Sequence, residues 1–379
     1  MKVLLLTDYY LPGYKGGGPI KTIANLIGAT SAEIDYKVVT SDRDLGDVSP
    51  YSNVDVGRWN RIGKYSVFYA ESGLKGLRQL HKIILDKDYD VIYLNSFFSV
   101  RFSLVPLLIA KIYKKPIVLG PRGEFSEGAL SLKAFKKKVY IRIFKLLGLA
   151  RGVVFQASSN FELGDIKKTL GSHDKIFVAE DIGSQEYAKD LVVKDAAVIK
   201  LVFISRISPM KNLAYALEVL KNISCSAVFD IYGPQEDAAY WSECEAIIKV
   251  LPEHVVVNYK GQLKPSDVVG TLSTYDLFLM PTKGENYGHV IAEALCAGLP
   301  ILIADTTPWR DLQGKGIGWD ISLEERRQFV WAIEKASAMS TENYQIYRQN
   351  VLSWAKTKFS QPEAVNANKA IFKLAVEKK

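Results

Sequence analysis

Cysteine and histidine are scarce in this chain of 379 residues. Its three cysteines, Cys225, Cys244 and Cys296, are an odd number and lack the short spacing of metal ligands. They predict free, mostly buried thiols in a reducing compartment. The four histidines are equally scattered, and we expect no metal or other cofactor.

Long apolar runs are also absent. No uninterrupted apolar stretch approaches the roughly 20 residues that a membrane-spanning helix needs. Residues 1–8 are apolar only briefly and end on Asp8, which predicts a buried first strand and not a signal peptide. With 48% hydrophobic and 24% charged residues, we expect a cytoplasmic globular protein whose length fits two domains.

Acidic residues are under-represented in the first half of the chain. Residues 1–180 contain 27 Lys and Arg against 17 Asp and Glu, whereas the remainder contains 22 against 24. The whole formal net charge of +8 therefore belongs to the first half. This asymmetry predicts an anionic partner for that half, whether a membrane surface, a phosphorylated acceptor or a nucleic acid.

Short apolar runs alternate with helical patterns, as they do in parallel sheets covered on both faces. The series starts at residue 3 and again at residue 201, which predicts two doubly wound, Rossmann-like α/β domains. We expect a first domain at 1–190 and a second at 191–359, with a C-terminal helix at 360–379 packing back on the first. The expected strands are 3–7, 36–40, 67–69, 91–95, 117–119, 153–157, 201–204, 228–232, 255–259, 277–280 and 301–304.

The clearest strand–loop–helix unit lies in the second domain. An apolar strand at 277–280 leads into a turn-rich loop, and a helix follows from about 287 to 297. Ligands of such sheets bind at the carboxyl ends of the strands, where this helix begins. Its unpaired N–H groups predict a phosphate site, and Gly288 lets a ligand approach the backbone closely.

Four charged residues belong to the same edge of the sheet. Glu285 and Glu293 can contact two parts of one ligand; alternatively, Glu285 only stabilises the positive helix end and Glu293 is solvated. Arg206 and Lys211 follow the strand at 201–204, five residues apart around a Pro turn. They can stabilise the negative charge of a leaving nucleoside diphosphate, or they are ordinary exposed loop residues.

Two segments of the second domain resemble glycosyltransferase family 4. They read Ser-Arg-Ile-Ser-Pro-Met-Lys-Asn at 205–212 and Gly-Glu-Asn-Tyr-Gly-His-Val-Ile-Ala-Glu-Ala-Leu at 284–295. The resemblance extends over most of the chain, including the Gly-rich turn at 15–19 and the loop at 120–125. It implies the GT-B architecture, retention of anomeric configuration and no requirement for metal.

The resemblance also implies roles for individual residues. Arg206 and Lys211 should hold the donor diphosphate and, with Glu285 at the donor sugar, form the catalytic group. Glu293 should hold the ribose hydroxyls. The other implied donor contacts are Gly17, Gly18, Gly233, Gly261, Leu263, Asn286, Tyr287, Gly288 and His289.

The acceptor side departs from the family at one position. Many relatives carry His-Gly after the strand equivalent to 117–119, whereas this chain has Arg122-Gly123. Arginine stays protonated and cannot act as a base, although it can bind phosphate or sugar hydroxyls. Glu124 and Asp8 are candidate bases by location, with a structural or acceptor-binding role as the alternative. The resemblance also implies that a phosphate oxygen of the leaving group can take the acceptor proton.

Three Asp-x-Asp sequences match the metal motif of other glycosyltransferases. Those at 86–88 and 88–90 precede the strand at 91–95 and therefore lie at the wrong edge of the sheet. The one at 42–44 lies within a polar loop. We expect no metal at any of them.

A basic segment without acids spans residues 132–150. Its apolar residues repeat at helical spacing, and lysines and arginines fill the positions between them. Such a helix can lie on an anionic membrane, or it can pack its apolar face on the core. The charge of the first half favours the membrane, and the absence of interleaved aromatics argues against nucleic acid. The apolar positions are Leu132, Phe135, Val139, Ile143 and Leu146.

Together these features predict a retaining, metal-independent glycosyltransferase that moves a sugar from a nucleotide-sugar donor to a glycan or lipid-linked acceptor. We expect it at the inner face of a cytoplasmic membrane, in surface polysaccharide or glycolipid biosynthesis. Two alternatives stay open. One is a nucleotide-sugar epimerase of the same architecture, which needs no acceptor, and the other is a catalytically silent binding subunit, favoured only by Arg122.

Overall fold

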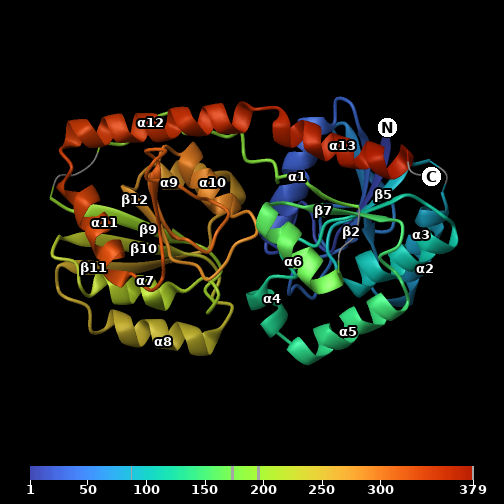
Figure 1. Cartoon of the computed structure of the whole chain (residues 1–379), viewed down its shortest axis with the longest axis horizontal. Helices are drawn as coiled ribbons and strands as arrows, with labels where there is room; N and C mark the ends of the chain where they lie inside the picture. Colours follow the sequence, from blue (N-terminus) through green and yellow to red (C-terminus); the bar gives the residue numbers. More distant parts are fainter. Residues whose placement is uncertain (87, 172–174, 194–196, 378–379) are drawn as a thin grey trace. The chain divides into compact units, whose positions relative to one another are not determined.

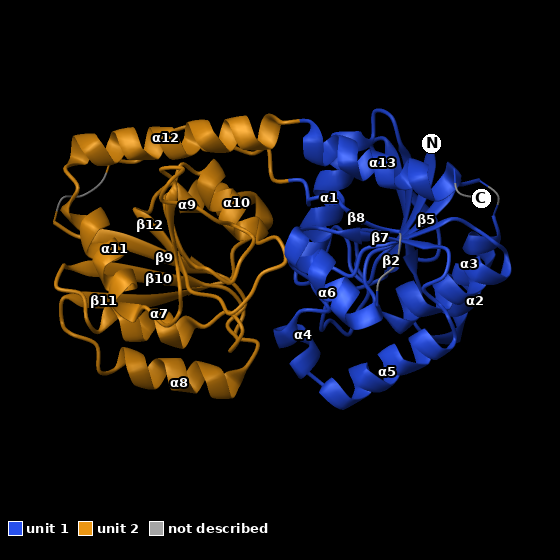
Figure 2. Ribbon diagram, in the orientation of Figure 1, with its two compact units in different colours: residues 1–182, 362–379 blue, residues 183–361 orange. Residues whose placement is uncertain are grey.

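A computed structural model describes residues 1–86, 88–171, 175–193 and 197–377. The chain forms two compact units, residues 1–182 with 362–379 (unit 1) and residues 183–361 (unit 2) (Figure 2). The sequence had placed the first boundary at 190/191. It falls earlier because Asn25 of unit 1 donates a hydrogen bond to the carbonyl oxygen of Ile182 at 2.9 Å, whereas the amide of Ala188 donates to Cys296 of unit 2 at 3.0 Å.

Unit 1 is built on an eight-stranded sheet in the order β3-β4-β2-β1-β5-β6-β7-β8. All neighbouring strands are parallel except β3 and β4, which form an antiparallel pair. The sequence did not predict β3 or β8, which are short, lie at the two edges and lack a buried apolar run. The strands are β1 Lys2–Leu6, β2 Asp35–Ser41, β3 Trp59–Ile62, β4 Tyr65–Ala70, β5 Val91–Leu94, β6 Ile117–Leu119, β7 Val153–Ala157 and β8 Ile176–Val178.

Helices cover both faces of this sheet because successive strand residues point to opposite sides. Val3 and Leu5 of β1 pack in one core cluster with α1 and α13, and Leu4 and Leu6 pack in another with α2, α3, α5 and α6. The C-terminal helix α13 lies against α1 and strands β5, β6 and β7 (Figure 1). The helices are α1 Gly18–Thr30, α2 Gly73–Leu85, the π-helical turn η1 Val100–Leu104, α3 Val105–Ile112, α4 Glu127–Ser131, α5 Ala134–Leu146, α6 Asn160–Leu170 and α13 Glu363–Glu377.

Unit 2 is built on a six-stranded parallel sheet in the order β11-β10-β9-β12-β13-β14. The predicted fold class, two doubly wound parallel α/β domains, is therefore confirmed. The strands are β9 Ile199–Ile204, β10 Ala227–Tyr232, β11 Val255–Gly261, β12 Leu277–Met280, β13 Ile301–Ala304 and the unpredicted β14 Gly318–Ile321. The helices are α7 Leu213–Leu220, α8 Ala238–Ile248, the 3₁₀ turn η2 Pro265–Asp267, α9 Val268–Leu272, α10 His289–Cys296, α11 Arg326–Ala338 and α12 Thr341–Ser360.

Each sheet has a point where the direction of strand addition reverses. In unit 1 the chain places β2 on one side of β1 and β5 on the other. In unit 2 it places β10 on one side of β9 and β12 on the other. The loops that leave adjacent strands diverge at such a point and leave a crevice, which is where doubly wound sheets bind ligands.

A buried arginine of α12 joins the C-terminal ends of α9 and α10 in unit 2. Arg348 of α12 has no exposed surface and donates hydrogen bonds to four carbonyl oxygens. Two of the acceptors, Ala297 and Gly298, follow α10, and their oxygens lie 3.2 and 3.0 Å from the guanidinium nitrogens. The third is Ser273, just after α9, at 2.8 Å, and the fourth is Val192 at 3.0 Å. The cation therefore sits where two helices present unpaired carbonyls and the negative ends of their dipoles. This fixes α10, whose opposite end faces the carboxyl edge of the sheet.

We expect Arg348→Met to lower the free energy of unfolding of unit 2 by about 3 kcal/mol, because several buried carbonyl groups lose their donor at once. For a unit of this size the melting temperature should fall by roughly 6–12 °C. Arg327→Met, at an exposed position of α11, is the matched control and should melt like the wild type. Equal melting of the two variants would show that Arg348 does not hold these helix ends.

Candidate functional site

Two loops meet at the switch point of unit 2. Residues 205–212 follow β9, and residues 281–288 follow β12, its neighbour in the sheet. The amide of Lys283 donates to the carbonyl oxygen of Met210 at 2.9 Å, and the Asn212 side chain donates to that of Pro281, also at 2.9 Å. Asn212 adopts a left-handed backbone conformation, which asparagine tolerates better than most residues. These bonds hold the two loops side by side.

Lys211 and Glu285 form an ion pair across these loops. Their side chains are only 14% and 13% exposed. Such partial removal from water strengthens each charge–charge interaction relative to an exposed pair. The structure thus brings together two predicted site residues that lie 74 positions apart in the sequence.

Arg206 lies at the same carboxyl edge of the sheet but is more exposed to solvent. Its guanidinium pairs with Glu236 at 2.8 Å, and the two side chains are 49% and 44% exposed. Exposed pairs of this kind contribute about 0–1 kcal/mol. An anionic ligand with several oxygens can therefore replace Glu236 as the partner of Arg206 at little cost.

The start of α10 is held in one conformation by its neighbours. Gly288 has φ 79°, and a Cβ atom there would lie 2.8 Å from the Ile291 side chain. The indole N–H of Trp309 donates to the Tyr287 carbonyl oxygen at 2.5 Å. The rings of Tyr287 and His289 lie 4.8 Å apart, and both side chains are buried. Residues 287–289 therefore form a rigid N-terminus rather than a mobile loop.

Glu293 lies on α10 and is almost fully buried, with 6% exposure. Burial raises the pKa of the nearby Cys296 thiol to about 12, and the Glu293 charge contributes to that rise. Asn286, in the loop before the helix, is half-buried. Contact of Glu293 with ribose hydroxyls stays a prediction.

Gly233 sets the distance between the loops after β9 and β10. Its φ is 134°, and a Cβ atom there would lie 1.8 Å from the Ser205 carbonyl oxygen, so only glycine fits. Its amide donates to the Gly261 carbonyl oxygen at 2.8 Å, which joins the loop after β11. Leu263, two residues further, is half-buried against the unit 2 core. Gly233 therefore controls the position of the residue before Arg206.

The Gly-rich turn of unit 1 is held by Asp44. One carboxylate oxygen of Asp44 accepts hydrogen bonds from the amides of Tyr14 and Lys15, at 2.7 and 3.0 Å. Gly17 then caps α1, and Gly18 begins it. Asp42, the other acid of this Asp-x-Asp sequence, pairs with Arg43 at 2.8 Å. Both carboxylates thus have partners within the chain, which gives this motif a structural role that the sequence did not predict.

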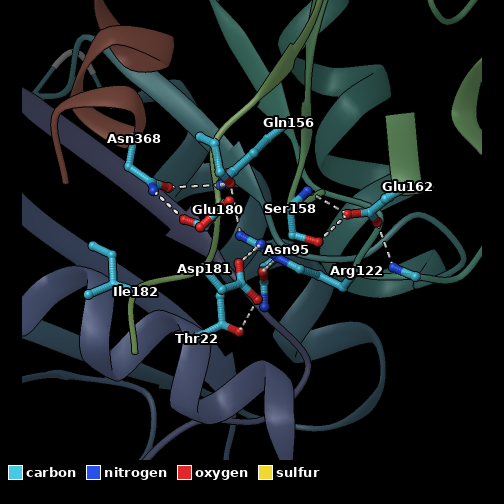
Figure 3. Close-up of polar contacts among 12 residues, drawn as sticks. Thr22, Asn95, Arg122, Gln156, Ser158, Glu162, Glu180, Asp181, Ile182 and Asn368 are labelled. Carbon is cyan, nitrogen blue, oxygen red and sulfur yellow. Dashed lines mark hydrogen bonds and ion pairs between the residues drawn. The ribbon is translucent and has the colours of Figure 1, made fainter. Parts of the chain in front are cut away.

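Arg122 lies in a buried ion pair with Asp181 at 2.5 Å, and the two side chains are 5% and 3% exposed (Figure 3). The guanidinium also donates to Asn95 at 2.7 Å, to the Tyr93 hydroxyl and to Gln156 at 3.4 Å. These partners occupy most of its donor capacity. In this structure Arg122 is therefore directed into unit 1 and away from solvent.

The partners of Arg122 continue into the segment by which the chain leaves unit 1. Thr22 of α1 donates to the Asp181 carboxylate at 2.9 Å, and Asn368 of α13 donates to the Glu180 carbonyl oxygen at 2.8 Å (Figure 3). Gln156 of β7 donates to the Asn368 side chain, also at 2.8 Å. Residues distant in sequence thus fix residues 180–182 in place.

Glu162 fixes the loop that carries Arg122. Its buried carboxylate accepts hydrogen bonds from the Gly123 amide at 2.6 Å and from the Ser158 amide and hydroxyl at 2.7 Å each (Figure 3). Arg122 and Gly123 both have positive φ values, 58° and 76°. A left-handed arginine costs roughly 1–2 kcal/mol. The surrounding polar contacts offset that cost.

The two candidate acids of unit 1 differ in how their oxygens are used. Glu124 accepts hydrogen bonds from the Ser96 hydroxyl at 2.8 Å and from the amides of Phe97 and Phe98. Asp8 is half-buried and accepts one from the Ser99 hydroxyl at 2.7 Å. Burial raises the pKa of both carboxyl groups above their ordinary values, although these hydrogen bonds counteract it.

Comparison with known proteins gives a family match in the unit that holds the Lys211–Glu285 pair. Residues 188–353 match the glycosyl transferases group 1 family. A 41.2 kDa protein in the cps region of Klebsiella pneumoniae is 26% identical over 300 residues, covering 75% of this chain and 79% of that protein.

Solved structures resemble the whole chain in fold. Anabaena HepE, in complex with UDP and glucose, has a TM-score of 0.70 at 16% identity, with 99% of both chains covered. Sucrose-phosphate synthase from Thermosynechococcus elongatus has a TM-score of 0.72 at 13% identity, with 97% of both chains covered. Unit 2 is thus a glycosyl transferases group 1 domain in a chain of GT-B fold. The chain is a glycosyltransferase.

Within this glycosyltransferase the predicted site residues fall into two sets. One set lies in unit 2, around the ion pair, the start of α10 and the loop at Gly233. The other lies in unit 1, at the start of α1 and in the loops after β1 and β6. The sequence marked Asp44 only as part of an Asp-x-Asp motif and missed its bonds to the amides of Tyr14 and Lys15. It also missed Glu162 and Asp181, whose carboxylates bind a loop amide and Arg122. No motif marks these two acids, because their partners are distant in sequence.

We expect Gly233→Ala to destabilise the glycosyltransferase by about 2 kcal/mol or more, because the new methyl group meets a backbone carbonyl and the backbone conformation disfavours alanine. Chemical denaturation followed by circular dichroism measures this change. Gly270→Ala on α9 is the control: a Cβ atom there meets nothing within 4 Å, and stability should rise slightly. Equal effects of the two substitutions would contradict the close approach at Gly233.

Proposed function

We propose that this glycosyltransferase moves a sugar, with retention and without metal, from a nucleotide-sugar donor to a glycan or lipid-linked acceptor. The observation that carries the proposal is the meeting of Lys211, Glu285 and the start of α10 at the switch point of unit 2. HepE, similar in fold, is a protein seen with UDP-glucose. The relative in a cps region supports a role in surface polysaccharide or glycolipid biosynthesis.

The donor diphosphate would be held by cations and amide hydrogens together. Lys211 supplies a point charge, and Arg206 supplies a planar fork suited to two phosphate oxygens. The N-terminus of α10 adds N–H groups and the positive end of the helix dipole. These groups are already in place before the reaction, so they stabilise the charge that develops on the leaving diphosphate without reorganising.

Glu285 would have two roles, to orient Lys211 and to bind the donor sugar. It keeps the Lys211 ammonium directed at the loop junction, and its other oxygen remains for a hydroxyl of the donor sugar. As the sugar–phosphate bond breaks, the anomeric carbon gains positive character, which a nearby carboxylate stabilises. Glu293 would take the ribose hydroxyls from its position on α10.

Two positively charged side chains at the donor edge support metal independence, because they can do what a metal ion would do. Arg206 and Lys211 provide two positive charges at the edge where a leaving group would need them. The Asp-x-Asp sequence at 42–44 is engaged with Arg43 and with loop amides. The carboxylates of Asp42 and Asp44 therefore already bind groups of this chain.

Helix α5 supports contact with an anionic membrane. The structure exposes the apolar positions of this segment: Phe135 is 80%, Ile143 50% and Leu146 78% accessible. Only Phe144 of the helix is buried. Lys138, Arg142 and Lys145 line a shallow hollow of about 330 Å³ beside these residues. Exposed apolar side chains among cations suit the interface of an anionic bilayer.

This surface is why we favour a transferase with a membrane-delivered acceptor over an epimerase, which would need no acceptor. Among the described residues, none of the helices combines the length and the apolar character that crossing a bilayer requires. Contact through α5 would therefore be peripheral. We place this contact at the inner face of the cytoplasmic membrane, where nucleotide sugars are available.

A thermal-shift panel of UDP-, GDP- and ADP-glucose, with and without EDTA, tests the donor site. We expect one base to raise the melting temperature strongly and the chelator to leave that rise unchanged. Lys211→Ala should lose most of the rise and most of the turnover while melting normally without ligand. Lys249→Ala, an exposed lysine after α8, is the control. Stabilisation that requires a divalent cation, or full turnover by Lys211→Ala, would contradict the proposal.

Co-sedimentation with phosphatidylglycerol vesicles tests the membrane surface. The double variant Phe135→Ser with Leu146→Ser should bind at least tenfold more weakly, because each exposed apolar side chain contributes on the order of 1–3 kcal/mol when it enters the interface. Val250→Ser, which changes an apolar residue of unit 2 that is 65% exposed, should bind like the wild type. Equal sedimentation of all three proteins would exclude α5 as the contact.

A further inference from the structure

A buried hydroxyl lies between the two loops that carry the Lys211–Glu285 pair. It belongs to Thr282, the second residue after β12, which has no exposed surface, whereas the next residue, Lys283, is exposed. A buried hydroxyl costs free energy unless it is hydrogen-bonded. The partners of the Thr282 hydroxyl therefore show what this side chain stabilises.

The Thr282 hydroxyl contacts the residue before each member of the ion pair. It donates to the carbonyl oxygen of Met210 at 3.1 Å, and Met210 precedes Lys211. It accepts from the amide of Gly284 at 3.3 Å, and Gly284 precedes Glu285. The Gly284 carbonyl oxygen lies 3.0 Å away and can share the hydroxyl proton. One oxygen atom thus bridges the loop after β9 and the loop after β12.

The backbone of Thr282 is itself held on the sheet. Thr306, which follows β13, donates from its hydroxyl to the Thr282 carbonyl oxygen at 2.6 Å. The Thr282 amide donates to the Met280 carbonyl oxygen at 2.9 Å. Since β12 lies between β9 and β13, the two threonines tie together the loops that follow three adjacent strands. The bridging hydroxyl therefore has a defined position.

Other bonds keep the two loops together without this hydroxyl. The Met210 carbonyl oxygen also accepts from the Lys283 amide at 2.9 Å, and Asn212 donates to Pro281 at 2.9 Å. The Thr282 hydroxyl adds contacts that lie one residue from each charged side chain. A backbone shift at either place moves the Cα atom from which a charged side chain extends. The hydroxyl thus controls the position of the charges more than the presence of the loops.

We propose that Thr282 is a positioning residue for binding of the donor diphosphate and that it acts through Lys211 and Glu285. The inference rests on the proposed function, in which Lys211 binds the diphosphate. Charged groups that are already in place stabilise an anion without reorganising, and this advantage depends on their geometry. The Thr282 hydroxyl fixes the backbone beside both members of the pair, so Lys211 keeps its position at the carboxyl edge. Thr282 itself needs no contact with the ligand.

The test is Thr282→Val, which keeps the branched shape of the side chain and removes its hydroxyl. Titration calorimetry gives the dissociation constants of UDP, GDP and ADP. For the nucleotide that the wild type binds most tightly, the variant should bind about tenfold more weakly, because Lys211 loses its fixed position. Its melting temperature without ligand should fall by only roughly 2–4 °C, the effect of one buried hydrogen bond.

Two further variants separate positioning from general destabilisation. Thr282→Ser restores the hydroxyl and should bind the nucleotide within about threefold of the wild type. Ser273→Ala is the matched control, because it removes another largely buried hydroxyl of unit 2, which donates to the Gly270 carbonyl oxygen at 2.8 Å. It should melt like Thr282→Val and bind the nucleotide like the wild type.

A double-variant cycle tests whether Thr282 acts through Lys211. In a Lys211→Ala background, Thr282→Val should change the dissociation constant by less than about twofold, because the charge that it positions is gone. An equal loss in both backgrounds would overturn the assignment. So would wild-type binding by Thr282→Val, binding by Thr282→Ser as weak as that of Thr282→Val, or the same weakening in Ser273→Ala.

Thr306→Val decides the question if Thr282→Val does not fold. Thr306 is exposed, and this substitution removes only the bond to the Thr282 carbonyl oxygen. Nucleotide binding should weaken about threefold, because the bridging hydroxyl is held less firmly; unchanged binding would overturn the proposal. Failure of the wild type to bind any of the three nucleotides, or wild-type binding by Lys211→Ala, would instead refute the proposed function itself.

Discussion

The unit 2 site depends on the ion pair between Lys211 and Glu285. The strand order places β9 beside β12, and this makes the loops that follow them neighbours. The bonds from Lys283 to Met210 and from Asn212 to Pro281 then bring the two side chains within contact. The pair keeps both charged groups at the loop junction, where their side chains remain 14% and 13% exposed.

Unit 1 uses the same sheet topology with a different way of fixing its loops. In unit 2 the loops bind each other largely through backbone groups. In unit 1 they are bound by buried side chains: Asp44 holds the Gly-rich turn, and Glu162 and Arg122 hold the loop after β6. Side-chain control of this kind lets single substitutions reshape a binding surface.

The sequence predicted most of the fold because buried parallel strands are continuous apolar runs, as at 277–280 and 301–304. It missed β3 and β8, which lie at sheet edges and have partly exposed residues. The meeting of Lys211 with Glu285 was predictable because each belongs to a short recognisable segment, at 205–212 and at 284–295. The donor contacts of Arg206 and Glu293 stay predictions. The partners of Arg122 were not predictable, because Asp181, Asn95 and Gln156 come together only through tertiary packing. For 132–150 the sequence left open whether the apolar residues contact a membrane or pack on the core. The structure buries Phe144 and exposes Phe135, so most of the apolar face does not pack on the core, and membrane contact stays a prediction.

Arg122 stands where the family resemblance implies a histidine, and its buried position constrains the loop after β6. A buried arginine requires a buried anion, and Asp181 supplies it at 2.5 Å. Histidine at this position would have too short a reach and too few donors to satisfy Asp181, Asn95 and Tyr93 at once. Leaving Asp181 without its cation would cost about 3–5 kcal/mol. Arg122 and Asp181 therefore act as one unit, which holds the loop in its left-handed form but contributes no base.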